Sequence, residues 1–286
     1  MNSAPRNPVV ETLDDVCALP LVRRLAAMLD HDPFAWRNGD FLPHGWHVIL
    51  FNVPTPQSML RADGAAALAV SLPDIGLHRL MMGGRQCRFT GEIPIGACVR
   101  RESRPGEVQL KHGRSGRFAL IKVEHRIFVE DQEEPAVVEH IDYVLREAVD
   151  AEAASPSAKA HAPATVVAPG RLAQADASRT LVPDAPLLFR YSSITDNPHR
   201  IHYDLAYATQ AEGYPGLVVN GSIPSIFLLE LFRSAARREP ATFSSRNLAP
   251  MFCDRPLQLR ALNDGNTWRL WAEDENGQTC FDASAT

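Results

Sequence analysis

The feature that most limits how this chain can fold is the stretch 148–177 near its middle, which is rich in alanine, proline and small polar residues and holds no aromatic residue. Such a segment buries too little apolar surface to offset the entropy lost on ordering it, so its composition predicts a linker. The linker separates 1–147 from 178–286 in a chain of 286 residues, a length that also favours two domains. We therefore expect two domains of ordinary size.

Each half combines apolar residues at helical spacing with short runs that are typical of strands. Helices are predicted at 19–29 and 222–238, where Ser222 is a candidate N-cap and Pro224 suits a first turn. The predicted strands are 46–53, 118–129, 141–145, 187–191, 256–262 and 267–272. The second helix is apolar on most faces and precedes antiparallel strands, which indicates an α+β layer with one sheet wrapped on one helix.

The composition excludes several classes of function. Hydrophobic residues make up 45% of the chain and charged residues 22%, as in a globular protein, and the net charge of −5 argues against binding to nucleic acid or an anionic membrane. The five cysteines are widely spaced without a Cys-x-x-Cys pair, so zinc and thioredoxin-like chemistry lack support. The chain starts without an apolar signal core and has no apolar run that could span a bilayer. We expect a cytoplasmic protein with reduced thiols.

The densest group of polar residues is 191–204, with the sequence YSSITDNPHRIHYD. It holds two histidines, two aspartates, an arginine and an asparagine in one connection, and such crowding of proton-carrying groups is typical of a functional loop. A solvated loop in which Asp196 or Asn197 caps a helix is the alternative interpretation.

A glycine-rich segment follows and runs directly into the second predicted helix. Its sequence, 213–221, is GYPGLVVNG. A glycine at a helix start allows a substrate to approach the free backbone N–H groups, whose partial positive charge can stabilise an enolate oxygen. Gly221 is therefore a candidate oxyanion-binding residue, and a simple turn is the alternative.

These two segments, YSSITDNPHRIHYD and EGYPGLVVNG, resemble the MaoC-like branch of the hot-dog hydratases and dehydratases. The motifs LPHGWH at 42–47, MMGG at 81–84 and KHGRSG at 111–116 extend the resemblance to the N-terminal half. The similarity is greatest to the group of itaconyl-CoA, mesaconyl-C4-CoA and 3-methylfumaryl-CoA hydratases. It implies an α+β double hot-dog fold, two antiparallel sheets each wrapped on a long central helix, with a dehydratase-like domain at 1–147 and a catalytic domain at 178–286.

The usual catalytic motif of these enzymes reads Asp-x-Asn-Pro-x-His. With its histidine placed on His202, its aspartate falls on Asn197, its asparagine on His199 and its proline on Arg200. Asp196 directly precedes Asn197, so the sequence leaves open which of these two residues acts together with His202. Where a histidine commonly precedes the glycine at the helix start, this chain has Asn220.

The resemblance implies roles for these residues in the hydration of a double bond next to a thioester. His202 would be the general base, because imidazole titrates near neutrality, with Asn197 and Asp196 as the other catalytic residues. The backbone N–H of Gly221 would polarise the thioester carbonyl. The remaining candidates for substrate binding are Arg200, His199 and Tyr191.

The implied activity is the reversible hydration or dehydration of a 2-enoyl-CoA thioester by a carbon–oxygen lyase that needs no cofactor or metal. The implied substrate is a short branched dicarboxylyl-CoA (itaconyl-, mesaconyl- or 3-methylfumaryl-CoA), as in itaconate degradation. Arg200 would meet the substrate carboxylate, with an ion pair to Asp204 as the alternative. A 3-hydroxyacyl-ACP dehydratase, an acyl-CoA thioesterase and a non-catalytic acyl-thioester binder are the alternative functions, and whether two chains pair as a homodimer is left open.

Overall fold

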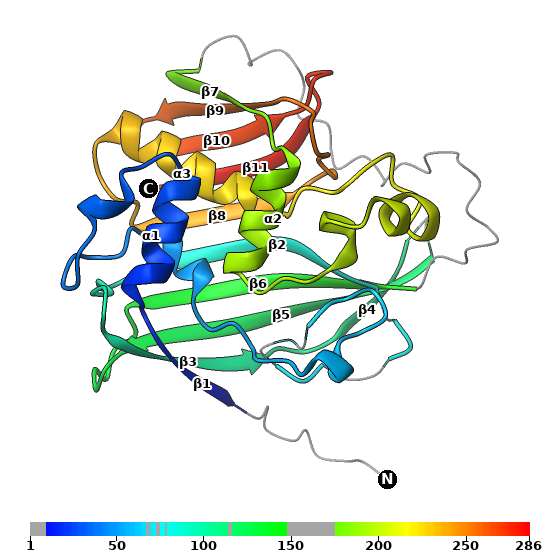
Figure 1. Cartoon of the computed structure of the whole chain (residues 1–286), viewed down its shortest axis with the longest axis horizontal. Coiled ribbons are helices and arrows are strands. Elements are labelled where there is room, and N and C mark those ends of the chain that lie inside the picture. Colours follow the sequence, from blue (N-terminus) through cyan, green and yellow to red (C-terminus); the bar gives the residue numbers. More distant parts are fainter. Residues whose placement is uncertain are drawn as a thin grey trace.

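The computed structural model describes residues 10–66, 68, 70–72, 75–77, 79–113, 116–147 and 175–286. These residues form one broad antiparallel sheet of 11 strands with its helices on one face (Figure 1). The strands are β1 (Glu11–Val16), β2 (Arg79–Phe89), β3 (Cys98–Pro105), β4 (Gln109–Gly113), β5 (Gly116–Val129), β6 (Val137–Arg146), β7 (Ala177–Leu181), β8 (Thr242–Asn247), β9 (Leu257–Asp264), β10 (Thr267–Glu273) and β11 (Thr279–Ala285). The helices are α1 (Leu19–Met28), α2 (Ala185–Ile194) and α3 (Ile223–Ala236), with short turns η1 (Pro33–Ala35), η2 (Trp46–Ile49), η3 (Gln57–Met59), η5 (Arg200–His202) and η6 (Tyr207–Ala211).

The two halves of the chain join edge to edge in this sheet. The strand order is β1-β3-β5-β6-β2-β8-β11-β10-β9-β7, with β4 paired to β5, so β2 of the N-terminal half pairs directly with β8 of the C-terminal half. Gly84 lies at this junction, and a Cβ there would collide with the carbonyl of Ser245. The architecture agrees with the α+β class expected from the sequence, although α1 has only 10 residues against 14 in α3. The helix described in the N-terminal half is therefore shorter than the long central helix that was expected there.

Helix α3 fills the concave face of the C-terminal half, as its apolar sequence predicts. Nine of its residues are buried, and Pro224 lies in its first turn. Ser222 is the N-cap, but its side chain makes no capping hydrogen bond. The Ser222 N–H itself donates to Asn220 Oδ1 over 3.1 Å, so the asparagine satisfies the backbone N–H of the N-cap residue.

Two strand predictions were wrong: 187–191 is helical, and 46–53 is a short helical turn followed by irregular backbone. The run 187–191 lies in α2, where Asp184 Oδ1 accepts a hydrogen bond from the Leu187 N–H over 2.9 Å and a proline stands in the first turn. The run 46–53 begins with η2, which follows Gly45 in the left-handed conformation, at φ +93°. Short apolar runs suit either structure, and at 187–191 the cap from Asp184 favours a helix. The predicted strands at 118–129, 141–145, 256–262 and 267–272 are confirmed.

The predicted linker, 148–177, falls largely on residues 148–174, which lie outside the described residues. Its last residues belong to the folded C-terminal half. The Asp176 N–H donates to the Ala261 carbonyl over 2.9 Å, and Ala177 begins β7 opposite the same residue. The folded segment therefore starts slightly before the predicted boundary.

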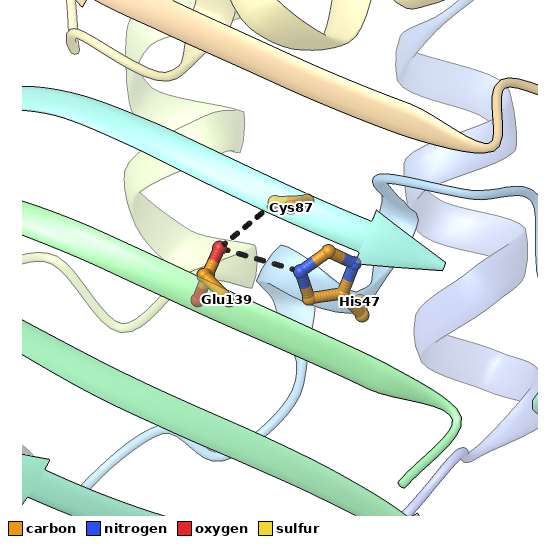
Figure 2. Close-up of side chains that lie close together, drawn as sticks. All are labelled: His47, Cys87 and Glu139. Atoms are coloured by element: carbon orange, nitrogen blue, oxygen red, sulfur yellow. Dashed lines mark hydrogen bonds and ion pairs between the residues drawn. The ribbon is translucent and has the colours of Figure 1, made fainter. Parts of the chain in front are cut away.

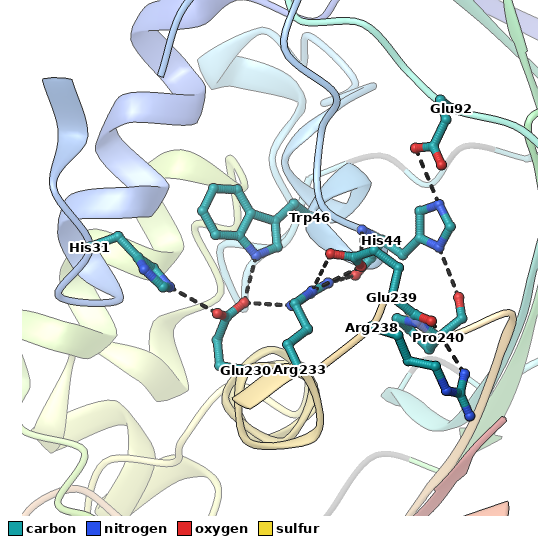
Figure 3. Close-up of polar contacts among 9 residues, drawn as sticks. All are labelled: His31, His44, Trp46, Glu92, Glu230, Arg233, Arg238, Glu239 and Pro240. Carbon is teal, nitrogen blue, oxygen red and sulfur yellow. Dashed lines mark hydrogen bonds and ion pairs between the residues drawn. The ribbon is translucent and has the colours of Figure 1, made fainter. Parts of the chain in front are cut away.

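A polar network fastens the N-terminal half to α3 (Figure 3). Glu230 of α3 accepts hydrogen bonds from Trp46 Nε1 (2.9 Å) and Arg233 Nη1 (2.6 Å), and it pairs with His31 (2.8 Å). The guanidinium of Arg233 also binds Glu239 and the carbonyl of His44. These contacts give two residues of the LPHGWH motif at 42–47 a structural role, because His44 and Trp46 bind the C-terminal half.

Within the described part of the chain, no helix combines the length and apolar character that a membrane crossing requires.

Candidate active site

A cavity of about 1050 Å³ lies between the helices and the sheet, and both halves of the chain line it. The C-terminal half contributes the 191–204 loop and the start of α3, which are the two segments singled out in the sequence. The N-terminal half contributes Met81, Met82 and Gly83 from β2, among others. The MMGG motif therefore faces the cavity, and the N-terminal half supplies one wall of it.

His202 is buried at the wall of this cavity and is held in one tautomer. Its Nδ1 lies 2.7 Å from the Val218 carbonyl oxygen. Because a carbonyl oxygen only accepts hydrogen bonds, Nδ1 must carry the proton, which leaves Nε2 as the basic nitrogen. Burial lowers the pKa of His202 to about 4. The ring is therefore neutral near pH 7 and can accept a proton.

Asn197 and Asp196 occupy different environments next to His202. Asn197 lines the cavity, and its Oδ1 accepts from the His199 N–H over 3.3 Å, so its NH₂ group is the donor that remains for a ligand. Asp196 also lines the cavity but is exposed, and its backbone has a φ of +44°. The structure places both residues by the cavity, with the amide the more enclosed.

His199 lies between His202 and a carboxylate from the other half of the chain. Its ring meets the His202 ring edge to face with centroids 5.7 Å apart, and its Nε2 is 3.8 Å from Asp63 Oδ2. Burial lowers the pKa of His199. Asp63 stands before Gly64, where φ is +82° and a Cβ would collide with the Pro198 carbonyl. The Asp-Gly turn of the N-terminal half therefore packs directly against the 191–204 segment.

Gly221 lies at the cavity just before α3, as expected. The N–H groups of Ser222 and Ile223 donate to the side chain and backbone of Asn220. The Gly221 N–H donates to no group in the described part of the chain, so it remains available to a ligand. A Cβ at this position would lie 3.1 Å from Asn247 Oδ1, which is a tight contact.

Tyr191 is buried on α2 and lines the cavity close to the start of α3. Burial raises the pKa of its phenol to about 12, although a hydrogen bond with Ser222 acts in the opposite direction. Tyr191 is therefore a neutral hydroxyl that can donate a hydrogen bond within the site.

Arg200 adopts the alternative considered from the sequence and does not line the cavity. Its Nε and Nη2 bind Asp204 Oδ2 at 3.0 and 2.7 Å, and the side chain is 40% exposed. The guanidinium also stacks on Tyr207, with 4.3 Å from Cζ to the ring centroid. The sequence spacing placed Arg200 inside the site, but the turn η5 directs it outward while His202 points inward.

The sequence analysis missed several polar residues that the N-terminal half brings to the cavity. They are Arg61, Asp63, Arg79, Arg85, Tyr143 and Arg146. They reach the site through sheet pairing and loop packing over long sequence separations, and only the Asp-Gly turn signal at 63–64 marked any of them locally.

One buried cluster resembles a metal-ligand set (Figure 2). His47 Nε2 and Cys87 Sγ lie 3.4 and 3.5 Å from Glu139 Oε1. Burial raises the pKa of Cys87 well above its ordinary value, which keeps it a thiol. The same oxygen of Glu139 lies 3.1 Å from Arg85 Nε. A guanidinium in that position repels a metal ion, so we assign the cluster to hydrogen bonding and ion pairing.

Comparisons with known proteins agree with this geometry. The family profile of hydroxyacyl-thioester dehydratase type 2 matches residues 45–253. A mesaconyl-C(4)-CoA hydratase from Chloroflexus aurantiacus is 36% identical over 271 residues, which cover 95% of this chain and 92% of the relative.

The fold has counterparts among solved structures. A MaoC-like dehydratase from Phytophthora capsici superposes with a TM-score of 0.67 at 14% identity, covering 98% of this chain and 95% of that one. A Mycobacterium tuberculosis protein described as a double hot-dog fold superposes with a TM-score of 0.58 at 14% identity, covering 98% and 96%. The expected double hot-dog class is confirmed, and the chain belongs to the hydroxyacyl-thioester dehydratase type 2 family of MaoC-like proteins.

Proposed function

We propose that the protein catalyses the reversible hydration of a 2-enoyl-CoA thioester whose acyl group carries a second carboxylate. The observation that carries this proposal is the neutral imidazole of His202 at the cavity wall, with its basic Nε2 free of the Val218 hydrogen bond. The same cavity is lined by Gly221, whose N–H donates to no group in the described residues. The 36% identity to a mesaconyl-C(4)-CoA hydratase supports the choice of substrate class.

The proposed mechanism assigns one task to each group. His202 accepts a proton from water as the water oxygen adds to C3, and the imidazolium so formed then gives a proton to C2 of the enolate, which completes the hydration and restores the neutral ring. The reverse reaction runs through the same steps in the opposite order. The Gly221 N–H at the positive end of α3 stabilises the charge that develops on the thioester oxygen. The amide NH₂ of Asn197 orients the water or the substrate carbonyl, since an amide cannot act as a base.

The test is a panel of purified 2-enoyl-CoA esters, each followed both by the loss of enoyl absorbance and by a thiol reagent. The proposal expects loss of absorbance and formation of a 3-hydroxyacyl or equivalent hydrated product without release of free CoA. Release of CoA without a hydrated product would indicate a thioesterase. A parallel reaction on the same acyl group carried by acyl carrier protein tests for an ACP dehydratase. We propose a cytoplasmic location, which the five widely spaced cysteines without a Cys-x-x-Cys pair support.

A further inference from the structure

The N-terminal wall of the cavity holds a buried arginine, Arg85, in the middle of the continuous sheet. It lies on β2 opposite Ile141 of β6 and Ser245 of β8, and it lines the cavity with a side chain that is 11% exposed. A buried guanidinium is costly unless anions accompany it, so its partners indicate what the site binds.

The charge of Arg85 is only partly matched by the protein. Its Nε lies 3.1 Å from Glu139 Oε1, outside good hydrogen-bond geometry. Glu139 raises the pKa of Arg85 against the effect of burial, so the arginine is charged. That carboxylate is shared, because Cys87 and His47 approach the same oxygen and Arg101 interacts with it from β3. One carboxylate thus serves two buried arginines, with Asp15 lying near the second.

The two terminal nitrogens of the Arg85 guanidinium are the part of this side chain that a ligand can reach. Within the described part of the chain its two terminal nitrogens make no hydrogen bond, and they are not among the buried nitrogens, which leaves them open to the cavity. Arg61 and Arg79 also line the cavity, but Asp63 pairs with the first at 2.6 Å, and Glu212 with the second at 3.0 Å. Arg85 therefore presents a fork of donors that a ligand can occupy. Arg146, the last residue of β6, also lines the cavity, and its side chain makes no hydrogen bond or ion pair within the described part of the chain, so its variant belongs in the test.

Two phenols lie beside this fork. Tyr143 and Tyr191 both line the cavity and both interact electrostatically with Arg85. Burial raises the pKa of each to about 12, so both are neutral donors. Tyr191 also interacts with Ser222, the residue after Gly221, and both line the same cavity as Arg85, so the fork and the proposed oxyanion site share one cavity. A planar fork flanked by hydroxyls is suited to a carboxylate at a short distance from a thioester carbonyl.

We propose that Arg85, with Tyr143 and Tyr191, binds the distal carboxylate of a short dicarboxylic acyl thioester and selects such substrates over monocarboxylic ones. This assignment rests on the proposed function and replaces Arg200, which is bound to Asp204 at the surface. Glu139 holds Arg85 in place through the contact at Nε. Burial alone would raise the pKa of Glu139, but Arg85 and His47 keep that pKa well below the usual range, so the carboxylate is charged.

The experiment compares ligands that differ only by a carboxylate in place of a methyl group. Fumaryl-CoA and crotonyl-CoA serve as substrates, and the saturated pair succinyl-CoA and butyryl-CoA serves in calorimetric binding. The variants are Arg85→Gln and the double variant Arg85→Gln with Glu139→Gln. The double variant removes both members of this ion pair, while Arg101 keeps Asp15 nearby, so it is a second route to a folded protein if the single variant is unstable. Arg88→Gln is the matched control, because Arg88 is exposed on the other face of β2.

We expect wild-type protein to favour each carboxylate-bearing ligand, and both Arg85 variants to lose about 30-fold or more of that preference in kcat/KM and in Kd, the range for an unpaired buried charge. Arg88→Gln should keep it. Equal losses for both members of a pair, no preference in the wild type, or a selective loss in Arg146→Gln instead would overturn the assignment. If no ligand is hydrated, the proposed function fails, while the succinyl-CoA and butyryl-CoA binding ratio still decides the role of Arg85.

Discussion

The network around Glu230 predicts a specific loss of stability when its carboxylate is removed. In Glu230→Ala the indole N–H of Trp46, which is 1% exposed, loses its partner, and leaving such a donor unpaired costs about 1–3 kcal/mol. Arg233 loses a 2.6 Å contact with Glu230 but keeps Glu239, so it contributes less to the loss of stability. The exposed His31 contributes little to that loss. The total is about 3 kcal/mol, or a fall in Tm of roughly 6–12 °C for a protein of this size.

Glu230→Gln should cost only about 1 kcal/mol, because an amide oxygen can still accept from Trp46. The assay is thermal and urea unfolding, with Glu275→Gln as the control, since Glu275 pairs with Arg255 at the surface at 3.3 Å. Glu230 does not line the cavity, so kcat/KM at 20 °C should stay within about threefold of wild type. If Glu230→Ala unfolds within about 2 °C of wild type, or no earlier than the surface control, the network does not fasten the halves together as described.

Three further predictions follow from the same structure. Burial lowers the pKa of both His202 and His125 to about 4. Below about pH 6.5 these histidines are therefore protonated in the unfolded chain but still neutral in the folded chain. The free energy of unfolding should fall as the pH drops from 6.5 towards 4, by up to roughly 3 kcal/mol per histidine. Denaturant titrations at several pH values measure this, and pH-independent stability across that window would contradict it. Gly64→Ala should cost at least about 1 kcal/mol and lower kcat/KM, because φ is +82° and Pro198 blocks a Cβ; unchanged stability and activity would show that the loop relaxes freely. A chain cut by a site-specific protease at a site inserted within 148–174 should remain one species on gel filtration, because β2 pairs with β8; two separate peaks in native buffer would refute this.

Sequence alone could predict the features that depend on neighbouring residues. The strand at 118–129 and the buried helix before the last strands follow from local periodicity. The place of His202 at the same cavity as the start of that helix was implied by the resemblance of its motif to a known family. The run 187–191 misled because its apolar residues suit a strand, whereas Asp184 and the following proline fix a helix start. That capping signal was present in the sequence and could have corrected the prediction.

The rest of the site depends on contacts that no local pattern encodes. Arg85 reaches the cavity because β2 is central to the joined sheet, and its neighbours Glu139 and Tyr143 come from β6. Arg200 was placed inside the site from motif position alone, but its Asp204 partner lies four residues on and draws it to the surface. The direction in which a charged side chain points from a turn depends on such contacts, and the sequence motif does not specify them.

The most direct test of the proposed catalytic role is the turnover of His202→Asn on a carboxylate-bearing 2-enoyl-CoA. The amide NH₂ of asparagine can replace Nδ1 in donating to the Val218 carbonyl, so this variant keeps the structural hydrogen bond and lacks the base. We predict that kcat falls by at least ~10²-fold while Tm stays within a few degrees of wild type. Near wild-type turnover in folded His202→Asn would contradict the assignment of His202 as the general base.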